Sequence, residues 1–295
     1  MRRTGGRRGL WDSVKAYWRW KQSNVTAAAS AAADKAAQDG GNGGASRPRL
    51  LSPVQPSSSP LQAVTGVVHD RRSCKRFDPT RPVDLEVLED LLAMTTRAPT
   101  ALNLQPWVAV VVHEAEQRAA LADAALGQPQ PRDAPVTVVF AGDMEPERNA
   151  PAALELGLES GYYHPMYGAG YLRSAYYLLH GGPMESMSHA KSLVSTWYSE
   201  TTGQAMLSVP TNKQAYAWKQ AMIPATTFLY LATAAGFDTA ILEGFDEAQV
   251  RRVAGLPARF TVPVIISVGH GAEHGFHSVR SPRFHTRHLI RWGKF

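Results

Sequence analysis

The sequence predicts a layered αβ domain, and three observations support this fold class. First, the runs at 108–112, 136–140 and 262–268 are apolar and rich in β-branched residues, which is typical of strands covered on both faces. Second, helical patterns separate these strands, so helices and sheet are expected to pack as layers. Third, a chain of 295 residues, 44% of them hydrophobic, is long enough to bury a sizeable core, and it has no internal repeat.

Helices are predicted where apolar residues recur at helical spacing between capping residues. Asp84 and Asp246 are suited to be N-caps, and the helix that follows Asp84 should end before Pro99. Pro224 is a candidate kink in a long apolar helix. The predicted helices span residues 61–70, 85–98, 114–126, 215–236 and 247–254, with a short fourth strand at 239–242.

Residues 144–213 depart from this pattern because they are rich in Tyr, Met, His, Ser and Gly. We interpret them as an insertion that forms either a lid or pocket wall over a ligand, or a docking surface. Tyr162, Tyr163, Tyr167 and Tyr171 are the candidates for a wall. Tyrosines at such spacing more often serve packing, so a purely structural role is the competing interpretation.

The charge is distributed unevenly, and this argues against nucleic-acid binding by the folded part. Residues 1–60 hold ten Lys or Arg and three Asp, a net of +7, whereas the remaining 21 bases and 22 acids give −1. Nucleic-acid binding needs a concentrated positive face, which a near-neutral domain does not predict. The single cysteine, Cys74, also excludes internal disulfides and multi-cysteine zinc sites.

Residues 1–60 form a basic, low-complexity N-terminal tail. An Arg-rich start, an amphipathic stretch with three tryptophans, an Ala-rich stretch and Gly and Ser/Pro runs follow one another. This pattern is typical of a transit peptide, mitochondrial as the first choice and plastid as the second. Docking to a membrane surface or a large complex is an alternative, and a solvated leader without a role is another.

The densest polar cluster lies between Arg71 and Phe77. Arg71, Arg72, Lys75 and Arg76, together with Ser73, offer bidentate guanidinium donors and a hydroxyl, which suit a phosphate group. A charge run is more often a solvated face, so this signal is weak alone.

Other residues in the sequence are weaker candidates for chemistry. The cations around Cys74 would lower the pKa of its thiol, although a packing role is the simpler interpretation. His270, His274 and His277 could share a helix face, but Gly271 and Gly275 disfavour a helix there, so no metal site is predicted.

Five further markers follow one another along the chain from about Leu61 to the C-terminus. They are Arg71-Arg72-Ser73-x-Lys75-x-Phe77, Ala98-Pro99 with Asn103-x-Gln105-Pro106-Trp107, Asp133-Ala134-Pro135, Gly236-Phe237-Asp238 with Leu242-Glu243-Gly244-Phe245-Asp246, and a closing strand ending at Gly269 with Arg283 after it. In this order they resemble the FMN-dependent nitroreductase family. The resemblance implies an α+β, layered α/β/α fold with a central mixed, largely antiparallel sheet flanked by helices.

The resemblance also implies a role for each cofactor-binding residue. Arg71, Ser73 and Arg283 would hold the FMN phosphate, with Arg72 and Arg280 as secondary candidates, because guanidinium groups make strong charge-assisted bonds to a dianion. Lys75 would lie near N1 and the C2 carbonyl of the flavin, where negative charge develops on reduction. The remaining implied residues are Leu242 with the backbone of Glu243 and Gly244 near N5, and Thr100, Asn103 and Gln105, of which Thr100 and Asn103 would come from the partner subunit of a homodimer.

The implied activity is that of an NAD(P)H-dependent flavin oxidoreductase. NADH or NADPH would pass a hydride to FMN, and the reduced flavin would then reduce a quinone, a nitroaromatic or a similar small acceptor. No protein side chain is predicted to be catalytic, because the cofactor carries the chemistry. One alternative is an accessory subunit of a large mitochondrial assembly with little or no turnover. Another is different flavin chemistry on the same fold, such as reductive dehalogenation or flavin breakdown.

Overall fold

The computed structural model describes residues 59–276 and 280–295. The targeting and docking interpretations of residues 1–60 fall on residues outside this described part, so they stay predictions. The boundary near residue 60 likewise stays a prediction. None of the described helices is long and apolar enough to cross a membrane.

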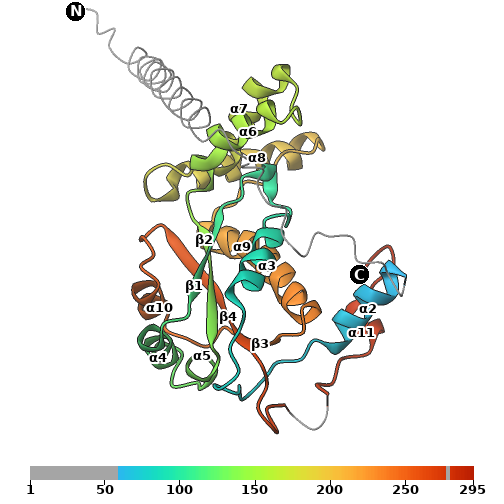
Figure 1. Cartoon of the computed structure of the whole chain (residues 1–295). Helices are drawn as coiled ribbons and strands as arrows, with labels where there is room; N and C mark the ends of the chain where they lie inside the picture. The colour runs from blue at the N-terminus through green and yellow to red at the C-terminus, as the bar shows by residue number, and fades with distance from the viewer. Residues whose placement is uncertain (1–58, 277–279) are drawn as a thin grey trace, which may run out of the picture. The chain divides into compact units, whose positions relative to one another are not determined.

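The centre of the fold is a four-stranded sheet in the order β1-β2-β4-β3 (Figure 1). Its strands are β1 (Trp107–Val112), β2 (Val136–Asp143), β3 (Asp238–Leu242) and β4 (Phe260–Gly269). All three strand pairs are antiparallel. An isolated parallel bridge joins Ser73 to Thr239 at the β3 edge. The predicted mixed, largely antiparallel sheet is therefore confirmed.

Helices cover both faces of this sheet, because successive strand residues point to opposite sides. On one face, α3 (Leu85–Thr95) and α9 (Lys213–Ala234) pack through Leu88 and Phe228 on Phe140 of β2. On the other face, α4 (Ala115–Ala124) and α10 (Glu247–Val253) pack on Val139 and Ile265. The predicted α/β/α layering is thus confirmed.

Most predicted elements occur close to their expected bounds. The side chains of Asp84 and Asp246 cap α3 and α10 by accepting backbone N–H groups of the first turn. Helix α2 (Pro60–Asp70) begins with a capping box between Ser59 and Gln62. A short α5 (Gln130–Asp133) precedes β2. Pro224 lies inside α9, which continues through it.

The first strand differs from its prediction. The run at 108–112 was expected to be covered on both faces, but residues 107–111 of β1 are only partly buried. The physical reason is position, since β1 is an edge strand of the described sheet and pairs with β2 alone. A run of β-branched residues predicts a strand that contacts apolar groups, but it does not predict whether that strand lies at the centre or at the edge of the sheet.

The insertion at 144–213 is helical. It contains α6 (Ala150–Glu159), α7 (Gly168–Leu179) and α8 (Ser186–Thr202), joined by the 3₁₀ turns η3 (Pro146–Asn149), η4 (Pro165–Tyr167) and η5 (Pro183–Glu185). These elements build a third core around Tyr171, Leu154 and Leu179, which also contacts Leu104 and Tyr216. The packing interpretation of the tyrosines therefore holds for Tyr171, which is 1% exposed.

Two segments of the described chain bury little surface. Helix α2 has no buried residue, and residues 280–295, which include the short α11 (Thr286–Leu289), are all exposed. Apolar side chains nevertheless occur in both, with Leu61 at 76% and Trp292 at 93% exposure. The guanidinium of Arg280 joins them by donating to the backbone oxygen of His69 at 2.6 Å.

Candidate functional site

The predicted phosphate-binding segment lies along the edge of the sheet. Its backbone pairs with β3, because the Cys74 N–H donates to the Thr239 carbonyl at 2.8 Å. Phe77 bridges to Gly271, and the Lys75 N–H donates to the Gly275 carbonyl at 2.7 Å. These bonds fix residues 73–77 between β3 and the chain that follows β4. The side chains of the segment are thereby held at a defined place on the sheet edge.

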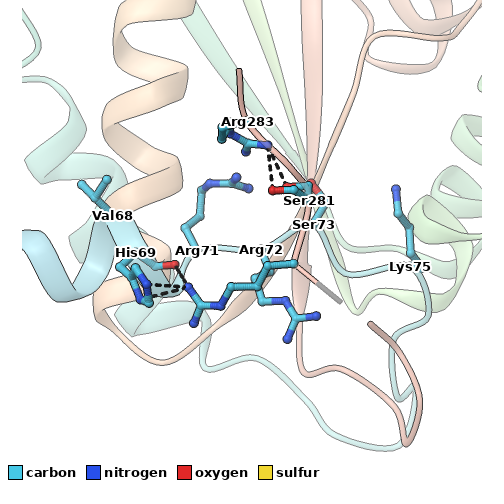
Figure 2. A pocket seen from close by; sticks show the side chains of 9 residues that line it. Val68, His69, Arg71, Arg72, Ser73, Lys75, Ser281 and Arg283 are labelled. Carbon is cyan, nitrogen blue, oxygen red and sulfur yellow. Dashed lines mark hydrogen bonds between the residues drawn. The ribbon is translucent and has the colours of Figure 1, made fainter. Parts of the chain in front are cut away.

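A cavity of about 560 Å³ opens at this place (Figure 2). Two parts of the chain that are some 200 residues apart in sequence form it, namely residues 68–75 and 280–283. Figure 2 shows the Arg283 guanidinium beside Ser281, to whose hydroxyl it donates at 2.8 Å. The complete lining is Val68, His69, Arg71, Arg72, Ser73, Lys75, Arg280, Ser281 and Arg283.

The cavity is strongly basic. It brings Arg71 and Arg283 together, as the resemblance required, and no acidic side chain lines it. Ser73 and Ser281 add hydroxyl donors beside the guanidinium groups. This donor set suits a dianionic phosphate, because charged planar donors and short hydroxyl bonds bind its oxygens strongly. The residues present therefore fit the phosphate end of a flavin mononucleotide.

Two of the arginines have additional partners. Arg280 donates to the backbone and ring of His69 and contacts Asp70 at 3.4 Å, so it attaches the C-terminal segment to α2. Hydrogen bonds from His69 and Arg280 lower the pKa of the Asp70 carboxyl. Arg72 places its guanidinium 5.0 Å from the centre of the Phe276 ring. The secondary roles of Arg72 and Arg280 as phosphate ligands stay predictions.

Cys74 has the packing role, and the expected lowering of its pKa is wrong. Its side chain is completely buried, and its Sγ donates to the Arg76 carbonyl at 3.0 Å. Burial raises the pKa of the thiol to about 11. The positive charge of Lys75 lowers the pKa, but its effect is smaller than that of burial, which removes water from around the thiolate.

The predicted contacts with the flavin ring lie at the far end of β3. Glu243 is four positions after Thr239, a rise of about 13 Å along an extended chain. Leu242 is buried in the core, so only its backbone is available to a ligand. The Gly244 carbonyl accepts a hydrogen bond from Gln128 Nε2 at 2.7 Å, which fixes the loop. The amide contact with N5 stays a prediction.

The third predicted group occupies an unusual loop between α3 and β1. Leu102, Asn103 and Gln105 all have positive φ, at 54°, 51° and 48°. Such backbone is strained for residues with side chains, and it persists where surrounding contacts enforce it, often at ligand-binding positions. Within the loop, the Gln105 N–H donates to Thr100 Oγ1 at 2.9 Å, which leaves the Thr100 hydroxyl hydrogen available to donate elsewhere.

Neighbouring elements hold this loop by hydrogen bonds. Gln220 of α9, 4% exposed, accepts from the Ala101 N–H at 3.0 Å. Asn149 Nδ2 donates to the Leu104 carbonyl at 3.0 Å, and the Tyr171 hydroxyl donates to the Leu102 carbonyl at 2.7 Å. The insertion thus positions the loop, a role that the sequence did not reveal.

Replacing Tyr171 with Phe tests this positioning role. The change removes the hydroxyl donor and leaves the partly buried Leu102 carbonyl without its partner, which costs about 1 kcal/mol. We expect a fall in the free energy of unfolding of that order, measured by chemical denaturation. The matched change Tyr162→Phe, at a side chain 73% exposed, should leave stability unchanged. Equal stability of the two variants would contradict the positioning role.

A second cavity, of about 900 Å³, is lined in part by this loop. Residues 96–103 line one wall, and residues 156–167 of the insertion line the other. Thr100 and Asn103 belong to this cavity and not to the basic one. Gln105 lines neither, and its Nε2 donates to the Asn103 carbonyl at 3.4 Å. The sequence did not single out Arg97 or Ser281, whose only signals are their places beside the Ala98-Pro99 and Arg283 markers.

The described residues hold no group of three or more His, Cys, Asp and Glu side chains that could bind a metal ion.

The fold and the site together define an α+β protein with an arginine-rich, basic cavity at the edge of its sheet. The model of the Nitroreductase family matches residues 68–270, more than half of the chain, so this chain belongs to the nitroreductase family. The predicted family is confirmed, and so is the prediction of an enzyme of the oxidoreductase class.

Relatives with assigned names agree with this membership. The chain is 31% identical over 212 residues to a protein named NADH dehydrogenase from Thermus thermophilus, covering 72% of this chain and 88% of the relative. It is 24% identical to the putative NAD(P)H nitroreductase YodC of Bacillus subtilis, covering 73% of this chain and 93% of that protein.

Solved structures show the same fold. A putative nitroreductase from Bacillus subtilis superimposes with a TM-score of 0.63 at 22% identity, covering 79% of this chain and 99% of that one. A putative nitroreductase from Exiguobacterium sibiricum, solved in complex with FMN, gives a TM-score of 0.56 at 21% identity. That match covers 78% of this chain and 96% of that one.

Proposed function

We propose that this chain is an FMN-dependent oxidoreductase that transfers reducing equivalents from NADH or NADPH to a quinone, a nitroaromatic or a similar small acceptor. The observation that carries the proposal is the basic cavity, where Arg71 and Arg283 meet without any acidic neighbour in the lining. The names of the Thermus and Bacillus relatives support NADH or NADPH as the donor. The FMN complex of the Exiguobacterium protein supports the cofactor.

The residues of this chain bind and orient in the proposed reaction. Arg71, Ser73 and Arg283 hold the phosphate, and Lys75 supplies a fixed positive charge where the reduced ring becomes negative. The loop at 243–244 offers backbone amides to the ring edge. When bound, FMN supplies two-electron transfer, so that NAD(P)H, one proton and a quinone give NAD(P)⁺ and a hydroquinone.

The active unit that we propose is a homodimer. Thr100 and Asn103 line a different cavity from the phosphate-binding arginines, which supports a flavin site shared between two subunits. The apolar side chains of α2 and of residues 280–295 are exposed in the single chain, and a second copy would cover them. Leu61, Val64, Phe284 and Trp292 are all more than 60% exposed.

The visible spectrum of the purified protein tests this function. We expect a yellow protein with flavin absorbance that bleaches on anaerobic addition of NADH or NADPH and recovers when a quinone is added. The mass measured in solution should be that of two chains. A colourless protein that takes up no added FMN would overturn the proposed function. A yellow protein that neither donor bleaches would instead favour the accessory role without turnover.

A further inference from the structure

The cavity between residues 96–103 and 156–167 has an aromatic wall. The ring of Tyr163 lies 4.9 Å from that of Tyr162 and 5.0 Å from that of Tyr167, measured between centroids. Tyr163 also packs on the buried Tyr171, at 5.4 Å. Such offset aromatic groups present flat, polarisable faces that stack on planar ligands.

Tyr163, the central ring of the wall, is held by contacts with α6. Gly157 lies directly beneath Tyr163, and a Cβ there would overlap the ring. The Tyr163 N–H donates to the Gly157 carbonyl at 2.8 Å. Burial and the neighbouring phenols raise the pKa of Tyr163, so its ring stays neutral and adds no negative charge to the wall. Tyr163 therefore supports the more exposed rings of Tyr162 and Tyr167, which offer their faces to a flat ligand.

The charge of the cavity has one sign. Arg97 is the charged side chain in the lining, which contains no Asp or Glu. The Arg97 backbone N–H bonds to Met94, and no side-chain bond of this arginine is recorded within the described residues. Thr96, Thr100, Asn103 and Ser160 supply the remaining polar groups. An anionic substituent on a flat ligand would therefore accept hydrogen bonds from the guanidinium and the hydroxyl groups of this cavity.

We propose that this cavity binds the electron acceptor and selects a planar aromatic molecule that carries an anionic group such as a carboxylate. This inference rests on the proposed function, since Thr100 and Asn103 line the cavity and are also the residues expected to reach the flavin of the partner subunit. If Thr100 and Asn103 contact the flavin as proposed, an occupant of the cavity would lie near the cofactor. The negative group is held by Arg97 and the aromatic ring by Tyr162 and Tyr167.

Two matched acceptors test this selection, 4-nitrobenzoate and its neutral analogue 4-nitrobenzamide. In each case NAD(P)H, one proton and the nitro compound give NAD(P)⁺, the nitroso compound and water. The measured quantity is the ratio of kcat/KM for the two acceptors, in the flavin-loaded full chain. We expect Arg97→Gln to lower this ratio about tenfold, the loss typical of one charge-assisted hydrogen-bonded pair. Arg173→Gln, at an exposed arginine of α7 outside the lining, should keep the wild-type ratio.

Binding without turnover gives a second readout. Benzoate should perturb the flavin absorbance of the loaded protein at lower concentration than benzamide does, and Arg97→Gln should abolish that difference. Tyr167→Ala should weaken binding of both compounds about two- to tenfold, whereas Tyr167→Phe, which keeps the stacking face, should restore it.

The outcomes separate this inference from the proposed function. A protein without flavin overturns both. A flavin-loaded protein that NAD(P)H reduces, but whose Arg97→Gln variant keeps the wild-type acceptor ratio, overturns the acceptor site alone. A variant whose loss appears only in the KM for NAD(P)H also overturns it, because the cavity would then bind the donor.

Discussion

Replacing Arg71 with Gln is expected to weaken FMN binding about 10- to 100-fold. A hydrogen bond to a charged group contributes about 1.5–3 kcal/mol, and the neutral amide keeps a donor but loses the charge and the bidentate geometry. Arg71 follows the last residue of α2 and lines the basic cavity together with Arg283 (Figure 2). The measurement is a titration of apoprotein with FMN, followed by the quenching of flavin fluorescence.

Control variants and the dependence on salt concentration show whether the lost affinity comes from the charge of Arg71 in the cavity. Arg81→Gln, at an exposed arginine outside the cavity, should leave the FMN affinity unchanged. The double variant Arg71→Gln/Arg283→Gln should lose more than either single change. Raising the salt concentration should weaken wild-type binding more than binding to the double variant, because fewer charges then remain to be screened. Unchanged affinity in the Arg71 variant would refute the assignment of this cavity to the phosphate.

The sequence predicted those parts of the fold that are controlled by local patterns. The caps at Asp84 and Asp246 and the four strands follow from rules that involve a few adjacent residues. The exposure of β1 did not follow, because the position of a strand within a sheet depends on pairing with distant segments. The helices of the insertion were not predicted, although Tyr171, Ala175 and Leu179 recur at helical spacing along α7, because the abundance of Tyr, Met, His, Ser and Gly in residues 144–213 hid this apolar face.

Local sequence patterns likewise predicted some features of the candidate site and missed others. The cluster at 71–75 is visible in the sequence because its charges are adjacent, but its meeting with Arg283 required the family resemblance. The contact of Arg280 with His69 joins residues 211 positions apart, which no local pattern encodes. The positive φ angles at Leu102 and Asn103 were equally hidden, because neither residue type signals left-handed backbone as glycine does. The failed expectation for Cys74 shows that burial outweighed neighbouring charge.

Replacing Lys213 with Met is expected to lower the free energy of unfolding by about 3 kcal/mol, because it breaks a buried ion pair on one side. Lys213 begins α9, and its Nζ lies 3.6 Å from Glu147 Oε1 and 3.6 Å from Glu185 Oε1. The Glu147 side chain is 7% exposed, and its Oε2 is buried without a partner among the described residues. Without the ammonium group, this carboxylate keeps only its 3.2 Å contact with His180.

The comparison variants distinguish loss of the ion pair from loss of a long side chain. Lys219→Met, at an exposed lysine on the same helix, should cost at most about 1 kcal/mol, through its contact with the Tyr216 ring. The double variant Lys213→Met/Glu147→Gln should regain part of the stability, because it removes the unpaired charge as well. Failure of the second change to restore any stability would show that the lysine acts through packing alone.

The same ion pairs join the insertion to α9, because Lys213 is the first residue of α9 and Glu147 and Glu185 lie in the insertion. Loosening them should disturb the tyrosine wall, which belongs to the insertion, more than the arginine cavity, which does not include residues of the insertion. Acceptor binding should then weaken in Lys213→Met while FMN affinity is retained, which would separate the two cavities energetically.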